Sequence, residues 1–157
     1  MMNKDDAAPR RDHYPHFSTI STRWTDNDVY DHVNNALYYN FFDTVIAGYL
    51  VAEGGFEFAT TGVIGLAVES GCRYRRPLAF PQEIQMGLRV AHLGNSSVRY
   101  EIGVFAADNC QAAADGYFVH VFVDRASNKP TAIPRRIRSA LERLVVLSSC
   151  RSELARE

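Results

Sequence analysis

The sequence lacks several features typical of membrane, metal-dependent and disulfide-bonded proteins. No apolar run approaches the roughly 20 residues that a membrane-spanning helix needs, and the polar N-terminus has no apolar core of the kind found in signal peptides. The three cysteines are an odd number at spacings that match no metal site. The five histidines are scattered and form no HExxH pair. We therefore expect no metal site, no disulfide framework and a cytoplasmic location.

The chain also has no large excess of positive or negative charge, and several catalytic motifs are absent. The 17 basic and 18 acidic residues give a net charge of −1, so neither a nucleic acid nor a membrane is an expected partner. There is no GxGxxG or phosphate-binding loop to hold a nucleotide cofactor. The absence of GxSxG disfavours a serine hydrolase. The 157 residues, 46% of them hydrophobic, suit one globular domain.

The hydrophobic pattern predicts one long helix among several strands. The helix should begin at Asn34 or Asn35, either of which is a suitable N-cap, and run to about Glu53, where two glycines can end it. Its apolar residues cover so much of its circumference that it should be buried. Strands are expected over 17–24, 63–74, 83–92, 97–106 and 113–124, and a last helix over 135–146. One antiparallel sheet packed on one long helix is an α+β fold.

Polar residues just before this helix form the most informative pattern of the chain, within RWTDNDVYDHVNNALYYNFFD (residues 23–43). Two carboxylates, Asp26 and Asp28, are followed by His32 and an Asn pair. A helix N-terminus offers free backbone N–H groups and partial positive charge, which suit an oxyanion. A carboxylate beside such a site predicts attack on a carbonyl group.

This stretch resembles the hotdog-fold acyl-CoA thioesterases of the 4-hydroxybenzoyl-CoA thioesterase type, whose motif has an acid pair followed by HVNNA and Tyr. The resemblance extends to RYRRP (residues 73–77), a GNSS turn (residues 94–97) and a closing segment over 130–141. It covers about residues 17–144 in order. It implies a hotdog fold, in which an antiparallel sheet wraps around one central helix, with a C-terminal helix added.

The resemblance implies roles for five residues of the motif. Asp28 would be the nucleophile or general base, although it could instead only brace the loop. The backbone N–H of Asn35 would be the oxyanion donor. His32 would polarise the carbonyl or orient Asp28, or else fix the helix entrance through a hydrogen bond. Tyr30 and Asn34 would lie at the substrate, Tyr30 where plant acyl-carrier-protein thioesterases carry an Asn of their catalytic triad.

The same resemblance implies that a cluster of arginines binds CoA. Arg73, Arg75 and Arg76 lie on or beside a strand end, and the planar guanidinium suits phosphate. The alternative is that they pair with acids such as Glu69. Asp43, within the helix, is a second candidate acid, because another branch of hotdog thioesterases uses an acid from this helix.

The expected function is hydrolysis of an acyl-CoA, with CoA as part of the substrate and no other cofactor. The resemblance implies a homodimer or homotetramer with sites between subunits. Two alternatives stay open: a hotdog hydratase or dehydratase, and a non-catalytic acyl-CoA-binding protein. The acyl group itself is not predicted. The expected layout is one domain over residues 16–147, with flexible tails over 1–15 and 148–157.

Overall fold

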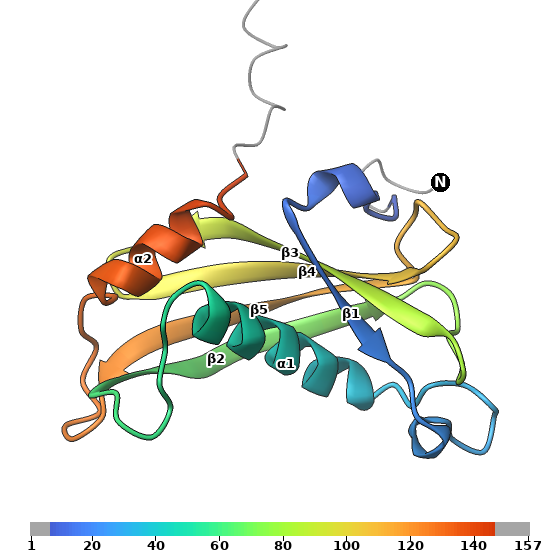
Figure 1. Ribbon diagram of the computed structural model, residues 1–157, viewed down its shortest axis with the longest axis horizontal. Coiled ribbons are helices and arrows are strands. Elements are labelled where there is room, and N and C mark those ends of the chain that lie inside the picture. Colours follow the sequence, from blue (N-terminus) through green and yellow to red (C-terminus); the bar gives the residue numbers. More distant parts are fainter. Residues whose placement is uncertain (1–6, 147–157) are drawn as a thin grey trace, which may run out of the picture.

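The computed structural model describes residues 7–146, which form one antiparallel sheet with a long helix against it (Figure 1). The sheet order is β1-β3-β4-β5-β2, so β1 and β2 are its edges. The strands are β1 (His16–Ser21), β2 (Val63–Tyr74), β3 (Glu83–Leu93), β4 (Ser97–Ala106) and β5 (Ala114–Asp124). The helices are α1 (Leu37–Ala52) and α2 (Arg135–Glu142), and short 3₁₀ turns occur at η2 (Arg11–His13) and η3 (Trp24–Asp26). The expected α+β hotdog arrangement is confirmed.

The start of α1 differs from the prediction. The residue before the helix is Ala36, which already has helical dihedral angles and makes no side-chain cap. The side chain of Asn34 accepts a hydrogen bond from the Ala36 N–H at 3.0 Å. Asn34 therefore closes a turn ahead of the helix rather than capping it, and the expected Asn34 or Asn35 cap was wrong.

Other boundaries shift by a few residues. β1 ends at Ser21 instead of residue 24, because the chain turns into η3. α2 ends at Glu142 instead of residue 146. Two of the strands, β2 and β4, have the bounds that their composition predicts.

The packed part of the chain begins before the boundary expected at residue 16. The Ala112 N–H donates to the Pro9 carbonyl at 2.8 Å, and the Arg11 N–H donates to the Cys110 carbonyl at 3.1 Å. Tyr14 is buried and packs edge-on against Phe105. These residues cover the face of the sheet that is turned away from α1. Residues 1–6 of the tail expected over 1–15, and the whole tail expected over 148–157, lie outside the described residues.

One side of α1 fills the concave face of the sheet. The buried side chains of the helix are Tyr38, Phe41, Phe42, Val45, Ile46, Tyr49 and Leu50. The contact is close enough that a Cβ on Gly116 of β5 would lie 2.5 Å from the Phe42 ring. The opposite side, including Tyr39, Asp43 and Val51, is exposed. The helix is thus less fully buried than its apolar composition predicts.

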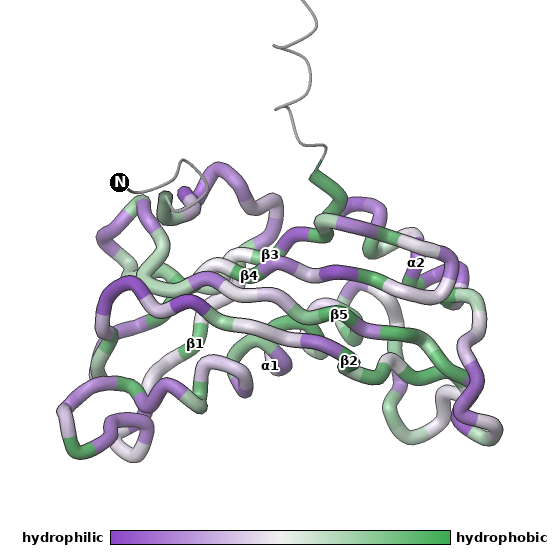
Figure 2. The backbone as a smooth tube through the Cα atoms, turned by 180° about the vertical axis from the view of Figure 1, so that it is seen from behind, coloured by the Kyte–Doolittle hydropathy of each residue, from purple (hydrophilic) through white to green (hydrophobic). Residues whose placement is uncertain are grey.

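The edge strand β2 is the most exposed part of the sheet. It pairs with β5 alone, and residues 66–70 are exposed. The side chain of Val68, at an irregularity in the pairing, is 61% exposed. Seen from behind, β2 and β5 are hydrophobic toward the end where α2 lies (Figure 2). No helix in residues 7–146 has the length and hydrophobicity to cross a membrane.

The close approach at Gly116 predicts that a single added methyl group destabilises the protein. Gly116→Ala should lower the free energy of unfolding by about 1–3 kcal/mol, because its methyl group would overlap the Phe42 ring and the Gly71 carbonyl. The matched control is Gly62→Ala, whose new Cβ meets no atom within 4 Å. Urea unfolding at one protein concentration measures both, and equal midpoints for the two variants would contradict the packing described.

Candidate active site

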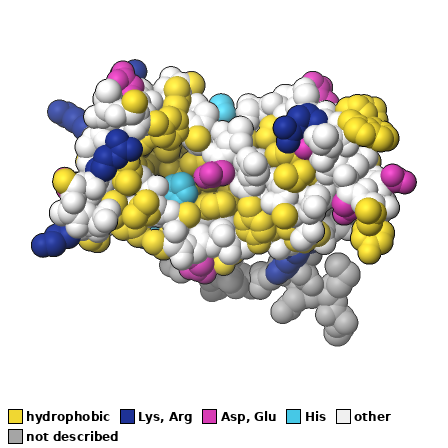
Figure 3. Space-filling model, turned by 90° about the horizontal axis from the view of Figure 1, so that it is seen from below, with side chains coloured by type: hydrophobic (Ala, Val, Ile, Leu, Met, Phe, Trp, Pro, Cys, Tyr) yellow, Lys and Arg dark blue, Asp and Glu magenta, His cyan; other side chains and the backbone are white. Residues whose placement is uncertain are grey.

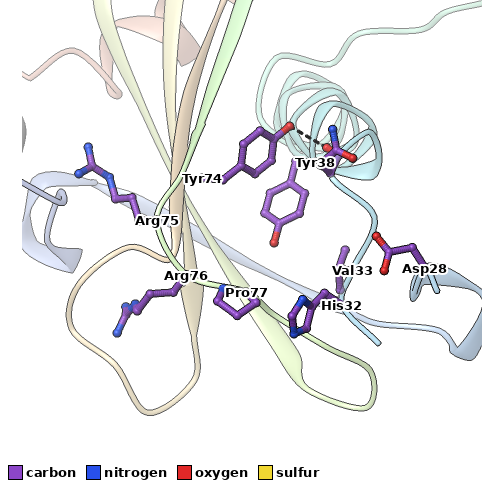
Figure 4. Close-up of a pocket in the computed structure, with 9 residues that line it drawn as sticks. Asp28, His32, Val33, Tyr38, Tyr74, Arg75, Arg76 and Pro77 are labelled. Atoms are coloured by element: carbon purple, nitrogen blue, oxygen red, sulfur yellow. Dashed lines mark hydrogen bonds between the residues drawn. The ribbon is translucent and has the colours of Figure 1, made fainter. Parts of the chain in front are cut away.

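A cavity of about 330 Å³ lies between the entrance of α1 and the end of β2 (Figure 4). It brings together three groups of the sequence motif: Asp28, His32 and Asn35. The remaining lining residues are Val33, Tyr38, Tyr74, Arg75, Arg76 and Pro77. Segments about 40 residues apart in the chain therefore share one pocket, as the candidate site residues require.

Asp28 is held in a closed loop. Its backbone N–H donates to the His32 carbonyl at 2.8 Å, and its carbonyl accepts from the Asp31 N–H at 3.1 Å. Asp31 takes a positive φ of 61°, which Asp tolerates better than most residues. One carboxylate oxygen of Asp28 accepts from the Tyr30 N–H at 2.8 Å. The carboxylate braces the loop and lines the pocket at once, so both roles considered for it are compatible with the geometry.

Asp26 supports this loop from inside. Its side chain is 2% exposed and accepts from the Arg23 backbone N–H at 2.8 Å and from the Arg23 guanidinium at 2.9 Å. Its carbonyl accepts from the Asn34 N–H at 2.9 Å, while the Val33 N–H donates to Leu78. Asp26 is thus a structural acid that ties both ends of the motif together, and it lies outside the pocket lining.

The backbone around Asn35 leaves one N–H group without a partner. The N–H groups of residues 33, 34, 36, 37 and 38 all donate hydrogen bonds. The Asn35 N–H donates to no group within the described part of the chain, although the residue lines the cavity. The Asn35 carbonyl is fixed by the Tyr74 hydroxyl, which donates to it at 2.8 Å (Figure 4). A fixed N–H at a helix entrance is suited to an oxyanion.

His32 lines the same cavity with an exposed side chain. Its imidazole makes no hydrogen bond to any of residues 7–146. The ring therefore does not fix the helix entrance through a hydrogen bond, which was one of the two roles considered. It is also not hydrogen-bonded to Asp28 in this conformation.

Two residues expected at the substrate lie outside the pocket lining. Tyr30 is at the tip of the closed loop, and the residue is 77% exposed. The Asn34 side chain is occupied in the turn to Ala36. Two tyrosines also line the cavity: Tyr38, which the sequence favoured as a core residue over a pocket residue, and Tyr74, which it did not single out. Tyr74 belongs to the RYRRP segment, of which the resemblance implied a role only for the arginines.

The arginines have different surroundings. Arg75 forms an ion pair with Asp115 at 2.6 Å, not with Glu69, which accepts from the Tyr117 hydroxyl instead. Arg76 is exposed and donates to the Gln111 carbonyl at 2.7 Å. Figure 4 shows both arginine side chains extending away from Asp28. Arg73 is not among the lining residues.

The inner wall of the cavity is aromatic and uncharged. The rings of Tyr38 and Tyr74 pack edge-on with centroids 5.1 Å apart. Burial raises the pKa of Tyr38 to about 12 and that of the neighbouring Cys72 thiol to about 11. Both groups are therefore neutral near pH 7. No group of three or more potential ligands in residues 7–146 is arranged to hold a metal ion.

Comparison with known proteins identifies the family. Residues 22–141 match the thioesterase-like superfamily. The chain belongs to this superfamily. It is 27% identical over 128 residues to the long-chain acyl-CoA thioesterase FadM of Escherichia coli strain K12, an alignment that spans 80% of this chain and 96% of FadM. The protein is accordingly a thioester hydrolase.

Solved structures agree with the fold. The PA5185 protein of Pseudomonas aeruginosa has 55% identity and a TM-score of 0.86, covering 88% of this chain and 96% of that one. The 1,4-dihydroxy-2-naphthoyl-CoA thioesterase Slr0204 of Synechocystis shares the fold at 12% identity, with a TM-score of 0.73 and coverage of 80% and 93%. The resemblance drawn from the motif, and the hotdog fold that it implied, are confirmed.

The buried hydrogen bonds of Asp26 predict what removal of its carboxylate does to the loop. Asp26→Ala should lower the free energy of unfolding by about 1–3 kcal/mol, because it leaves the Arg23 N–H without its acceptor. It should also speed amide exchange at Asn34, whose N–H bonds to residue 26. Urea unfolding and hydrogen exchange measure the two effects. The control is Asp12→Ala, an exposed ion-pair acid that should change little. Unchanged exchange at Asn34 in the Asp26 variant would contradict the brace.

Proposed function

We propose that this protein is an acyl-CoA thioesterase whose hydrolysis takes place at the cavity between the α1 entrance and β2. The observation that carries the proposal is that the Asp28 carboxylate and the unpaired Asn35 N–H line the same cavity. The name of FadM supports acyl-CoA as the substrate class. No cofactor is required, because water is the second reactant and CoA is part of the substrate.

The proposed mechanism begins with the carbonyl oxygen of the thioester at the Asn35 N–H. Negative charge that develops on this oxygen is stabilised by the N–H and by the N-terminal end of α1, and one such donor contributes roughly 3–4 kcal/mol. The Tyr74 bond to the Asn35 carbonyl holds the peptide group in place. Preorganisation of this kind avoids a reorganisation cost during the reaction.

Asp28 acts in one of two ways. As a general base it takes a proton from water while the water oxygen attacks the carbonyl carbon, and the C–S bond breaks to release CoA as the thiol after protonation. As a nucleophile it forms a mixed anhydride and expels CoA, and water then hydrolyses the anhydride to the acid. His32, with no hydrogen bond to the described residues, is free to orient toward the bound thioester or toward Asp28.

The cavity rim provides for the CoA portion. Arg76 is exposed at the rim and is proposed to meet a phosphate, since guanidinium donors match phosphate oxygens. Arg75 is less suited because Asp115 already pairs with it. Three residues outside the cavity lining are proposed to contact the part of CoA that extends beyond the cavity: Arg73, Tyr30 and Asn34.

We further propose a homodimer formed through β2, in the cytoplasm. Monomeric proteins usually cover an unpaired sheet edge. In this chain the edge of β2 is unpaired and carries exposed apolar side chains such as Val68. A site between subunits follows from such pairing. Cys72 and Cys110 are free thiols, as expected in a reducing compartment. A tetramer built from two such dimers is the second candidate assembly.

The hydratase and binding-protein alternatives are less well supported. The superfamily and the named relatives are thioesterases, and the cavity holds a carboxylate that a binding protein does not need. The alternatives predict no release of thiol.

Replacing Asp28 tests the chemistry directly. Asp28→Asn should lower kcat for free-thiol release from acyl-CoAs by about 10²–10⁴-fold, because the amide is neither a base nor a nucleophile. The matched control is Asp31→Asn, which removes the same charge from the same loop at a position that Asn tolerates. Unchanged release by a folded Asp28→Asn protein would move the chemistry to another group, with Asp43 the next candidate.

A charge on the β2 edge tests the assembly. Val68→Lys should convert the protein to monomers in sedimentation velocity and abolish thiol release, because a lysine there opposes strand pairing. Thr19→Lys places the same charge on the other edge strand, β1, and should leave both properties unchanged. An active monomer would show that the site is complete within one chain.

A further inference from the structure

A histidine under α1 has polar atoms with no partner. His120 lies on β5, and its residue is only 7% exposed. Neither ring nitrogen is hydrogen-bonded to any described residue. Leaving a buried polar group unpaired costs about 1–3 kcal/mol, so such groups are rare without a purpose. The ring therefore points to a group that completes its hydrogen bonds in the working protein.

The surroundings of His120 keep the ring uncharged. Burial lowers the pKa of His120, while the negative charge of Asp43 on α1 opposes this effect. A neutral imidazole has one donor and one acceptor nitrogen. The Tyr100 ring packs edge-on at 5.3 Å, and its buried hydroxyl also lacks a partner among the described residues. Two polar groups thus lie unsatisfied in one otherwise apolar part of the core.

Small residues leave His120 close to the surface between α1 and β2. Ala67 is its partner across the β2–β5 pair, and a Cβ built on Gly65 would lie 3.3 Å from its Nδ1. Seen from below, this face is hollowed, with hydrophobic side chains in the hollow and a histidine and an acid side by side at its border (Figure 3).

No hydrogen bond to the described residues fixes the orientation of the His120 ring. The nitrogens are covered in the present conformation, so other atoms account for the exposed part of the residue. A half-turn about the Cβ–Cγ bond exchanges nitrogen and carbon positions within the same volume. A ligand that bonds to the nitrogens would select this conformation.

The position of His120 relative to the cavity defines which part of a substrate it would meet. Asp43 follows Asn35 by eight residues, which corresponds to about 12 Å along a helix. Ring contacts connect the first turn of α1 to His120, since the ring centroids of Tyr39 and Phe118 are 6.4 Å apart and those of Phe118 and His120 are 5.8 Å apart. His120 is not among the residues that line the cavity, so only a part of the substrate remote from the thioester can meet it.

We propose that His120 binds a hydroxyl group on the remote part of the acyl chain, so that the preferred substrates are hydroxylated acyl-CoAs. This inference rests on the proposed thioesterase function. A hydroxyl can donate to the unprotonated nitrogen of a neutral imidazole or accept from the protonated one, so it gives one of the two nitrogens a partner. An apolar chain in the same place leaves those nitrogens unpaired, and sites of this design discriminate against analogues that lack the hydroxyl.

The test uses decanoyl-CoA and a series of hydroxydecanoyl-CoAs that differ in the position of the hydroxyl. The full chain should prefer one remote isomer over decanoyl-CoA by about tenfold in kcat/KM, the size of one hydrogen bond. His120→Phe should lose this preference and keep its activity on decanoyl-CoA, because Phe fits among the neighbouring aromatic side chains. His120→Gln, which retains a donor and an acceptor, should keep part of the preference. His92→Phe, an exposed histidine on β3, is the control and should keep all of it.

Three outcomes would overturn the proposal. The first is a wild-type protein that favours no remote hydroxyl isomer, a result that needs no variant to fold. The second is a His120→Phe protein that keeps the preference. The third is loss of activity on all substrates together with loss of the dimer in sedimentation, which would assign His120 to the subunit interface. Absence of thiol release from every acyl-CoA by the wild type would instead refute the thioesterase proposal itself.

Discussion

The packing of α1 into the concave sheet is the interaction on which the rest of this protein depends. Phe42 and Ile46 are almost fully buried in this contact, and each such side chain contributes about 1.5–3 kcal/mol. The close approach of Phe42 to Gly116 leaves little freedom for the helix to slide or rotate. Its N-terminal end is therefore fixed relative to β2, and that end carries the candidate oxyanion donor.

A set of polar contacts transfers this rigidity to the reacting groups. The Tyr74 hydroxyl ties β2 to the carbonyl of Asn35, and Asp26 ties Arg23 at one end of the motif to Asn34 at the other. Asp28 then has only a short closed loop in which to move. The Asp28 carboxylate lies on the loop and the Asn35 N–H lies at the entrance of α1. The packing of α1 against the sheet positions both.

The two sides of α1 have separate uses. The buried side builds the core, and its residues follow the helical period. The other side is exposed and carries Asp43, whose charge acts on His120. A single helix thus supplies stability, the site entrance and, in our proposal, part of the acyl-recognition surface.

The sequence by itself determined the fold class, the position of the strands and the family, because strand and helix periods and the HVNN motif are local patterns. It also identified Asp28 and Asn35 as neighbours in one motif. Tertiary structure decided that Tyr74 joins them, that Arg75 is engaged by Asp115, and that Tyr30 turns to solvent. It also decided that His120 lies unpaired beneath α1. These outcomes depend on contacts between residues far apart in the chain, and no local pattern encodes which distant group will occupy a hydrogen bond.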